Sequence, residues 1–369
     1  MRGFINQQID VMTQLPYLGN KHRKMRLEIH PFGSRGESRA PNSHGLFFLS
    51  DATTGPRTLP HSQSRWRRSK DEREDLIHSR IDESDTALFG ASNGNTPGAG
   101  YMRWGKDTFA NVRPIHWQPG FNSPLRDPSG IDYVIVRENL EDMYVGVMGE
   151  AKHLLEAGLA DRRSRIPSGA NEGRFAAKII TRPGTEQVAR FACELAMQRE
   201  ASLTVSAKTN MLPATDKWFC DIVREIAEEY PGLDHREFII DDMAHRLVVE
   251  PHDLDVLLLP NLYGDILSDL GAGTVGGLGL APSGCYGNNF AYFESSHGTA
   301  PDLEGRGVIN PTATLLSASM MLRYLNLEES ANRLETALAE VYRSGAQLTP
   351  DQGGSAPTER FAEAVIGEL

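Results

Sequence analysis

The sequence contains few cysteines and no long hydrophobic run. Only 3 of its 369 residues are cysteine, and Cys193, Cys220 and Cys285 are widely and irregularly spaced. They form neither a disulfide framework nor a zinc-binding pattern, and they fit reduced thiols in a cytoplasmic protein. No apolar run approaches the length needed to cross a bilayer, and the first residues lack a secretory apolar core. We therefore expect neither membrane association nor export.

Positive charge is scarce outside the first 80 residues. The chain carries 38 Lys+Arg against 49 Asp+Glu, a formal net charge of −11. Residues 1–80 hold 14 Lys+Arg and 8 Asp+Glu, a balance of +6, which leaves −17 for the rest. An acidic body argues against nucleic acid as a partner. The basic leader is rich in Ser, Pro and His, and its composition predicts a solvated or disordered segment.

Strand-like and helical stretches alternate beyond the leader, which predicts an α/β fold. Apolar runs of strand length cover residues 86–91, 131–137, 202–207 and 254–260. Helical periodicity covers residues 185–199 and 215–230, and two helices at 312–325 and 328–344 are expected to close the chain. Within the leader only residues 45–50 are clearly strand-like, and the polar residues 151–171 predict a hairpin or an excursion.

One glycine motif is misleading. Gly271-Ala-Gly-Thr-Val-Gly276 matches the dinucleotide-binding pattern G-x-G-x-x-G. That phosphate loop requires a strand immediately before it and a helix that begins within it. Here a helical segment precedes the glycines, and Gly277, Gly279 and Pro282 follow. The pattern favours backbone freedom at a domain junction and not a Rossmann phosphate loop.

Three aspartates lie at the ends of strand-like runs. Asp265 and Asp269 follow the run at 254–260 and are spaced i, i+4 on a predicted helix, where two carboxylates on one face repel each other. A divalent cation would relieve that repulsion, since Mg²⁺ and Mn²⁺ prefer carboxylate oxygens. Asp241, at the end of another run, is placed to supply a third oxygen. The alternative is a favourable charge at a helix N-terminus and a solvated aspartate.

Basic and phenolic groups suit a reaction on a small polycarboxylate. Arg103, Arg113 and Arg137 lie at the edges of ordered elements, and guanidinium groups bind carboxylates in a bidentate manner. Tyr144 and Lys208 are candidate proton carriers. Surface salt bridges, a packing tyrosine and a solvated lysine are the alternatives for these residues taken singly.

Four segments together resemble the β-decarboxylating dehydrogenases, the family of isocitrate, 3-isopropylmalate, homoisocitrate and tartrate dehydrogenases. The segments are Phe109-Ala-Asn-Val-Arg-Pro114, Val134-Ile-Val-Arg-Glu-Asn139, Asn261-Leu-Tyr-Gly-Asp-Ile-Leu-Ser-Asp269 and His297-Gly-Thr-Ala-Pro-Asp302. The resemblance covers about residues 73–369. It implies a two-domain isopropylmalate-dehydrogenase-like α/β fold with a large mixed sheet, distinct from the Rossmann fold. Residues 1–108 plus 276–369 would form the cofactor-side domain, and residues 109–275 the substrate, metal and dimerisation domain.

The resemblance also assigns roles to individual residues. Arg103, Arg113 and Arg137 would bind the carboxylates of a malate, and Asp241, Asp265 and Asp269 would hold Mg²⁺ or Mn²⁺. Lys208 would be the base for the C2 hydroxyl and Tyr144 the acid that protonates C3. In the implied homodimer, Lys208 and Asp241 would reach the active site across the subunit interface.

The resemblance places the cofactor at the loop that begins at His297. Its implied cofactor-binding residues are His297, Gly298, Thr299, Ala300, Pro301, Asp302 and Asn310, with Asn310 near the adenine. A carboxylate beside the adenosine ribose accepts hydrogen bonds from its hydroxyls and repels a 2′-phosphate. Asp302 therefore predicts NAD as the cofactor.

The chain departs from the family pattern in two places. Nothing in residues 1–80 matches the family's opening Gly-Asp-Gly-Ile-Gly-Pro-Glu loop, so we expect weaker NAD binding. Before Arg103, where family members distinguish the C3 substituent of malate, the chain has Thr96, Pro97, Ala99 and Gly100. These match neither the Ser-x-Asn of isocitrate enzymes nor the acidic residue and leucines of isopropylmalate enzymes.

The expected function is NAD- and Mg²⁺/Mn²⁺-dependent oxidative decarboxylation of a 3-substituted malate of the isocitrate or 3-isopropylmalate type. A tartrate- or malate-type dehydrogenase is the alternative enzyme. A non-catalytic regulatory paralogue is the alternative from another class, which the missing glycine loop favours and the retained catalytic residues oppose.

Overall fold

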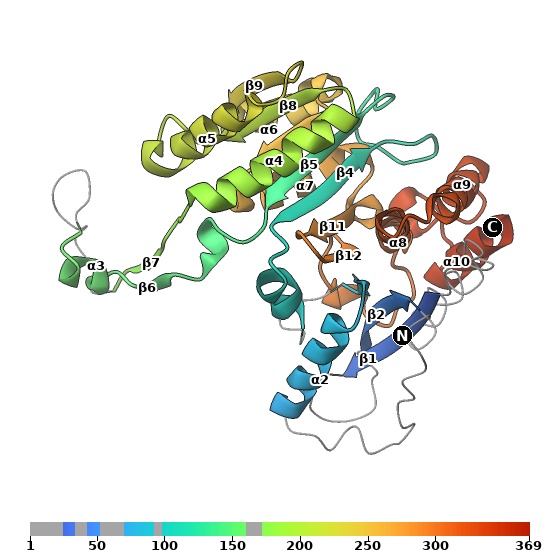
Figure 1. The fold of residues 1–369 in the computed structure, drawn as a ribbon. Helices are drawn as coiled ribbons and strands as arrows, with labels where there is room; N and C mark the ends of the chain where they lie inside the picture. Colours follow the sequence, from blue (N-terminus) through green and yellow to red (C-terminus); the bar gives the residue numbers. More distant parts are fainter. Residues whose placement is uncertain (1–24, 34–42, 52–69, 92–97, 160–171) are drawn as a thin grey trace.

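The computed structural model describes residues 25–33, 43–51, 70–91, 98–159 and 172–369 (Figure 1). The disorder expected for the leader concerns mainly residues 1–24, 34–42 and 52–69, which lie outside the described residues. Two strands of the leader are described, β1 (Met25–Gly33) and β2 (Ser43–Asp51), and they pair antiparallel. The strand expected at residues 45–50 is thus confirmed.

The centre of the fold is a mixed sheet. Its ten described strands run in the order β1-β2-β3-β12-β11-β4-β5-β10-β8-β9. The strands after β2 are β3 (Thr86–Phe89), β4 (Ala110–His116), β5 (Asp132–Glu138), β8 (Ser202–Ala207), β9 (Asp234–Ile239), β10 (Val256–Leu259), β11 (Pro282–Tyr286) and β12 (Ala291–Ser295). Strands β5, β10, β8 and β9 are parallel neighbours, whereas β4 pairs antiparallel with both β5 and β11. The expected large mixed sheet, distinct from a Rossmann sheet, is confirmed.

Helices cover both faces of the β5–β10–β8 region (Figure 1). Successive side chains of a strand point to opposite faces. Val256 and Leu258 accordingly pack into one core with α4 (Arg182–Gln198) and α5 (Trp218–Ala227). Leu257 and Leu259 pack into another with α6 (Ile240–Val249) and α7 (Asn261–Val275). Such continuous apolar runs are typical of strands buried on both faces.

The C-terminal third differs from the sequence prediction in two ways. The glycine-rich stretch after residue 276 contains the strands β11 and β12, which pair antiparallel near the middle of the sheet. Small residues weaken the hydrophobic alternation in β11, whereas β12 contains Tyr292 and Phe293, a strand signal that the prediction overlooked. Helices α8 (Thr312–Tyr324) and α9 (Glu328–Ser344) match the two expected ones, but the expectation that they close the chain is wrong. A third helix, α10 (Thr358–Glu368), follows and buries Phe361 and Val365.

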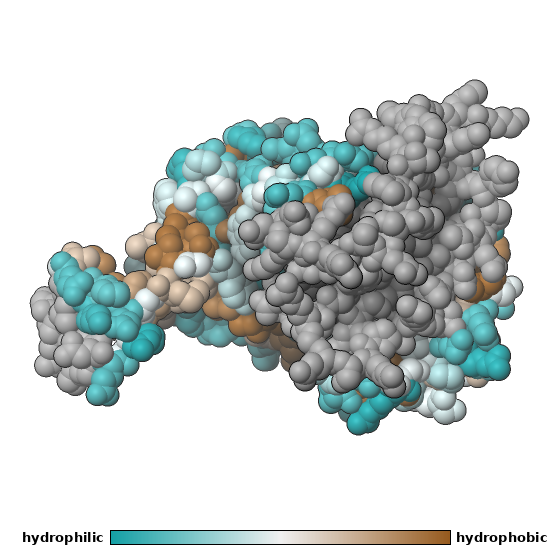
Figure 2. All heavy atoms as spheres, turned by 90° about the horizontal axis from the view of Figure 1, so that it is seen from below, coloured by the Kyte–Doolittle hydropathy of each residue, from teal (hydrophilic) through white to brown (hydrophobic). Residues whose placement is uncertain are grey.

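An arm projects from the body between β5 and α4 (Figure 1). It contains β6 (Met148–Glu150), α3 (Lys152–Glu156) and β7 (Arg174–Ala176), and β6 pairs only with β7 among the described strands. Figure 2 shows the arm standing clear of the main body, with apolar surface beside its base. The excursion predicted from residues 151–171 lies here, although residues 160–171 are outside the described ones.

The buried side chains of the described residues fall into separate cores. Two cores lie around β4, β5, β8 and β10. A third forms where α8, α9 and α10 pack on β12. A fourth lies beneath α2 (Lys70–Asp82). The predicted division into domains at about residues 109 and 276 is compatible with this grouping and stays a prediction. No helix in the described part of the chain combines the length and apolarity that a bilayer crossing requires.

Candidate active site

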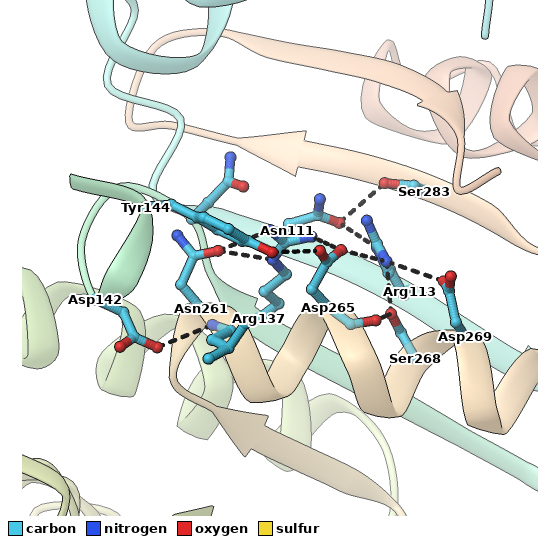
Figure 3. A network of polar contacts seen from close by, with 12 residues as sticks. Asn111, Arg113, Arg137, Asp142, Tyr144, Asn261, Asp265, Ser268, Asp269 and Ser283 are labelled. Atoms are coloured by element: carbon cyan, nitrogen blue, oxygen red, sulfur yellow. Dashed lines mark hydrogen bonds and ion pairs between the residues drawn. The ribbon is translucent and has the colours of Figure 1, made fainter. Parts of the chain in front are cut away.

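The site forms where β4, β5 and β10 meet the start of α7. Asn111 of β4 lies directly opposite Arg137 of β5, and Arg113 is two residues further along the same face of β4. Arg113 is the middle residue of β4, so its expected place at the edge of an ordered element is wrong. The next strand in the sheet, β10, ends at Leu259, and α7 begins two residues later. The side chains on this face of β4 and β5 therefore point at the first turns of α7 (Figure 3).

Asp265 of α7 is the centre of a cluster of polar contacts (Figure 3). Its Oδ1 accepts a hydrogen bond from Arg137 Nη1 and lies 3.4 Å from Arg113 Nη1. Its Oδ2 accepts a hydrogen bond of 2.9 Å from the Tyr144 hydroxyl. Asp269, one turn later, has its Oδ1 3.6 Å from Arg113 Nη1. Two of the predicted metal ligands, two of the predicted carboxylate-binding arginines and the predicted acid thus lie together.

Gly264 explains how the helix comes so close to Arg137. A Cβ atom at this position would lie 2.6 Å from both Cβ and Cγ of Arg137, closer than carbon atoms can approach. Gly271 allows a similar approach further along α7, because a Cβ there would lie 2.7 Å from the Tyr133 hydroxyl. The misleading glycine pattern at 271–276 lies almost wholly inside α7, so the expectation that the helix ends before it is wrong. Gly271 serves helix-to-sheet packing, and only Gly276, with a φ of 131°, has the backbone freedom expected of the pattern.

The third arginine, Arg103, lies in the short π-helix Tyr101–Gly105. Its Nε donates a 2.7 Å hydrogen bond to the Asn139 carbonyl, and its Nη2 donates one of 3.3 Å to Asn261 Oδ1. Asn261 Oδ1 also accepts hydrogen bonds from Nε and Nη2 of Arg137, at 2.9 and 2.7 Å. One amide oxygen thus joins two of the three arginines.

Asn261 and Ser268 were not predicted as site residues. Ser268 Oγ lies 2.5 Å from Arg113 Nη1, and Asn111 Oδ1 lies 3.4 Å from Arg113 Nε. Asn261 and Ser268 stand in the quoted α7 motif, at positions −4 and +3 from Asp265 on the same helical face. Helical spacing was therefore a usable signal for both residues.

Burial changes the electrostatics of the cluster. The side chains of Arg113 and Arg137 are only 8% and 5% exposed, whereas those of Asp265 and Asp269 are 37% and 49% exposed. Burial, reinforced by the neighbouring Arg113, lowers the pKa of Arg137 to about 10. Burial and the hydrogen bond to Asp265 raise the pKa of Tyr144. Burial also raises the pKa of Asp269, against the opposing effect of Arg113.

The three predicted metal ligands do not come together within one chain. In the described residues, no three His, Cys, Asp or Glu side chains gather closely enough to hold a metal ion. Asp241 lies in the first turn of α6 and pairs with Lys208 instead, with 2.5 Å between Oδ1 and Nζ. This pairing lowers the pKa of Asp241. Asp265 and Asp269 are partly exposed carboxylates on one helical face, a donor type that fits Mg²⁺ or Mn²⁺ provided that a further oxygen comes from outside this group.

The predicted cofactor loop follows β12. It includes the short 3₁₀ helix Pro301–Leu303, and Asp302 is exposed, so its carboxylate is accessible to ribose hydroxyls. Ala300 has a positive φ of 42°. Asn310 is buried, and its Nδ2 donates to the Tyr342 hydroxyl and to Asp351 Oδ2 at 3.1 and 3.0 Å. The side-chain amide of Asn310 is thus already engaged within the protein, and its placement near the adenine stays a prediction.

A buried glutamate next to Arg137 gives the site a pH-dependent stability. Burial raises the pKa of Glu138 to about 7, above its ordinary value of 4.5. Between these two values the folded chain holds a proton that the unfolded chain has released, so stability falls as pH rises through this window. The shift from 4.5 to about 7 corresponds to a change of about 3 kcal/mol in the free energy of unfolding.

We expect Glu138→Gln to remove the pH-dependent contribution of Glu138 to the free energy of unfolding. Urea denaturation at pH 5 and pH 8 should show a smaller fall in the free energy of unfolding for the variant than for the wild type. Equal falls in both proteins would contradict the prediction.

The comparisons with known proteins identify a family. The family model described as "Isocitrate/isopropylmalate dehydrogenase" matches residues 74–365. An isocitrate/homoisocitrate dehydrogenase of Thermus thermophilus is 39% identical over 86% of this chain and 92% of its own length. A 3-isopropylmalate/3-methylmalate dehydrogenase of Methanocaldococcus jannaschii is 40% identical over 79% of this chain and 83% of its own.

A solved structure leads to the same family. The isocitrate dehydrogenase from Methylococcus capsulatus superposes with a TM-score of 0.67 and 31% identity, over 81% of this chain and 85% of that one. Relatives named for NAD and relatives named for NADP both occur. With the family model covering most of the chain and relatives matching along nearly their full length, the chain belongs to the isocitrate/isopropylmalate dehydrogenase family.

Proposed function

We propose that the protein is a homodimeric, NAD- and Mg²⁺/Mn²⁺-dependent enzyme that oxidatively decarboxylates a 3-substituted malate of the isocitrate or 3-isopropylmalate type. Oxidation and decarboxylation of hydroxy acids is the chemistry of the family. The observation that carries the proposal is the convergence of Arg113, Arg137 and Tyr144 on Asp265. A binding protein without catalysis would not need a proton carrier at the centre of a carboxylate-binding cluster.

The arginines would bind the substrate carboxylates. Arg113 and Arg137 are buried, and their contacts with Asp265 partly neutralise them in the free protein. A malate derivative brings two or three carboxylates, which guanidinium groups bind through paired hydrogen bonds. Arg103 lies beside the segment that contains Ala99 and Gly100 and would bind the carboxylate nearest the C3 substituent. Thr96 and Pro97 of this segment lie outside the described residues.

Asp265 and Asp269 would hold the metal ion together with Asp241 from the second chain. When bound, such a cation supplies Lewis-acid chemistry at the C2 oxygen of the substrate. Within one chain Asp241 is separate from Asp265 and Asp269, and dimerisation would bring the Asp241 carboxylate of one chain to Asp265 and Asp269 of the other. Exposed apolar side chains support a dimer, among them Met148 of the arm, Val249 of α6 and Ile266 of α7, which are 65%, 53% and 57% exposed.

Lys208 and Tyr144 would move the protons. Lys208 would act as the base that takes the proton of the C2 hydroxyl, and a nicotinamide held by the loop that begins at His297 would supply the hydride-accepting chemistry when bound. After CO₂ leaves, C3 needs a proton, which the Tyr144 hydroxyl supplies. The raised pKa of Tyr144 keeps its phenol protonated at neutral pH, as an acid must be. Lys208 Nζ lies 2.5 Å from Asp241 Oδ1, so engagement of Asp241 by the metal would break this ion pair and leave the amino group of Lys208 free to contact the substrate.

We expect NAD⁺ to be preferred over NADP⁺ because of Asp302. Its exposed carboxylate would repel a 2′-phosphate, and like charges brought together at an interface cost several kcal/mol. Asp302→Lys should therefore shift the ratio of kcat/KM for the two cofactors towards NADP⁺ by at least about tenfold. The exposed Glu304, two residues further along the same loop, provides the control substitution Glu304→Lys. A wild-type preference for NADP⁺ would show that Asp302 does not select the cofactor.

A substrate panel tests the proposed function. Isocitrate, homoisocitrate, 3-isopropylmalate, tartrate and malate would each be supplied with Mn²⁺ and either cofactor, with reduced nicotinamide and CO₂ measured together. Reduction with CO₂ release from a 3-substituted malate is the expected result, whereas turnover of only tartrate or malate would favour the alternative enzyme. No turnover would overturn the proposal.

Thermal denaturation then separates an inactive ligand-binding paralogue from a chain without a binding site. Mn²⁺ plus NADH should raise the melting temperature of any protein that binds them in its folded state. A shift without turnover would indicate the regulatory paralogue, for which the unmatched N-terminal sequence is the supporting observation.

A further inference from the structure

A buried group of charges lies behind the site and takes no part in the chemistry proposed above. We name it the Lys178 cluster; it consists of Lys178, Asp142, Asp216 and Tyr263. Lys178 Nζ lies 3.2 Å from Asp142 Oδ1, 2.7 Å from Asp216 Oδ1 and 4.3 Å from the centre of the Tyr263 ring. The lysine side chain is 10% exposed and both aspartates are 0% exposed. Charges so deeply buried are costly, and a well-packed apolar group would often serve stability equally well.

Each aspartate uses its other oxygen to hold the backbone of a functional segment. Asp142 Oδ2 accepts a 2.9 Å hydrogen bond from the Leu262 N–H, in the first turn of the helix that carries Asp265. Asp216 Oδ2 accepts a 2.8 Å hydrogen bond from the N–H of Lys208 itself. One ammonium group therefore connects the start of α7 with the backbone of the proposed base.

Asp142 also sets the position of Tyr144. It immediately precedes the 3₁₀ helix Met143–Val145, and its backbone has φ 65° and ψ −139°, a conformation that is strained for a residue other than glycine. Its N–H donates a 2.8 Å hydrogen bond to the Ile179 carbonyl, next to Lys178 in the sequence. The segment that leads to Tyr144 is thus held by the backbone hydrogen bond from Asp142 to Ile179 and by the ion pair between Asp142 and Lys178.

We propose that Lys178 is a positioning residue that fixes the two proton carriers, Tyr144 through Asp142 and Lys208 through Asp216. The proposal rests on the proposed function of those two residues. Without the ammonium group, two buried carboxylates would face each other uncompensated. They would move apart, and the hydrogen bonds from the N–H groups of Leu262 and Lys208 would loosen. In the proposed dimer Lys208 serves the partner's site, so each Lys178 would act on both active sites.

Lys178→Met in the full-length protein tests this. We expect kcat to fall by about tenfold to a hundredfold, because small displacements of catalytic groups have effects of that size. KM for the hydroxy acid should change less than kcat, because Lys178 acts on Arg103 and Arg137 only indirectly, through the start of α7. Lys178→Arg keeps the charge and should recover part of the loss. Lys152→Met, which removes an exposed lysine paired with Glu150 on the arm, is the control.

Two outcomes would overturn the proposal. One is an unchanged kcat in Lys178→Met. The other is that Lys178→Met and Lys178→Arg lose the same factor in kcat/KM and also show the same fall in melting temperature. Lys178 would then have only a structural role.

A second measurement does not depend on turnover. Hydrogen exchange of the Leu262 and Lys208 amides should accelerate in Lys178→Met, while the amides of α9 keep their wild-type rates. If the wild type turned over no substrate, the proposed function would fail, yet faster exchange at both amides would still support the positioning of these two segments. Unchanged exchange at either amide would overturn the bridging role whether or not the protein is active.

Discussion

A heterodimer of one Lys208→Met chain and one Tyr144→Phe chain is expected to regain about half of the wild-type turnover, although each variant alone is nearly inactive. Each single substitution removes a proton carrier, which typically costs about 10²- to 10⁴-fold in rate. If Lys208 reaches the active site of the partner, the heterodimer contains one site with both residues intact and one with neither. Co-expression with two different affinity tags would isolate it for steady-state assay.

The matched control places the same substitutions in one chain. A heterodimer of a wild-type chain and a Lys208→Met/Tyr144→Phe chain should be nearly inactive, since each of its sites then lacks one carrier. Sites built from a single chain would give the opposite pair of results, and that outcome would contradict the proposed shared site. Circular dichroism melts should stay close to wild type for both single variants, because Tyr144 and Lys208 are partly exposed.

The same heterodimers can locate the action of Lys178. Adding Lys178→Met to the chain that supplies Tyr144, or to the chain that supplies Lys208, should lower the restored activity in both cases. A loss in only one arrangement would overturn the proposal that one ammonium group positions both carriers.

Asp265→Asn is expected to weaken Mn²⁺ binding by at least about tenfold and to lower the stability of the metal-free protein by about 2 kcal/mol. The first effect follows from loss of a proposed carboxylate ligand. The second follows because Arg113 and Arg137 would lose the anion between them and repel each other. Titration calorimetry with Mn²⁺ and urea denaturation without metal measure the two effects separately.

Asp221→Asn is the matched control for this substitution. Asp221 is a partly exposed aspartate on α5 that pairs with Lys217 and Arg224, away from the site. It should lose only the small stability of a surface ion pair. Unchanged Mn²⁺ affinity in Asp265→Asn would remove Asp265 from the ligand set.

Periodicity and strand-end position were enough to predict much of this molecule. The apolar run before Asn261 is a buried strand and the segment after it is a helix, so the juxtaposition of Asp265 with Asp269 followed from i, i+4 spacing. Arg137 was placed at the end of a strand, where β5 has it as the penultimate residue.

The remainder depends on contacts between distant segments. Asn261 joins Arg103 and Arg137 across more than a hundred residues of sequence, and Lys178 joins two aspartates that sequence spacing does not connect. The strand β11 was missed because serine and glycine interrupt its alternation, and β12 was missed although Tyr292 and Phe293 favour a strand. Antiparallel pairing joins the two strands, and β12 packs against α8. The third helix, α10, was missed as well. The arrangement of two chains lies outside anything that periodicity within one chain can encode.

The missing side chain at Gly264 has a consequence for how such a protein can evolve. Because α7 lies directly against Arg137, any larger residue at 264 would push the whole first turn away and carry both acidic groups with it. Natural selection for a new substrate therefore has little freedom on this helix. Adaptation would proceed through the segment before Arg103, where Gly100 has room for a side chain, since a Cβ there would meet only the Trp104 ring, at 3.7 Å.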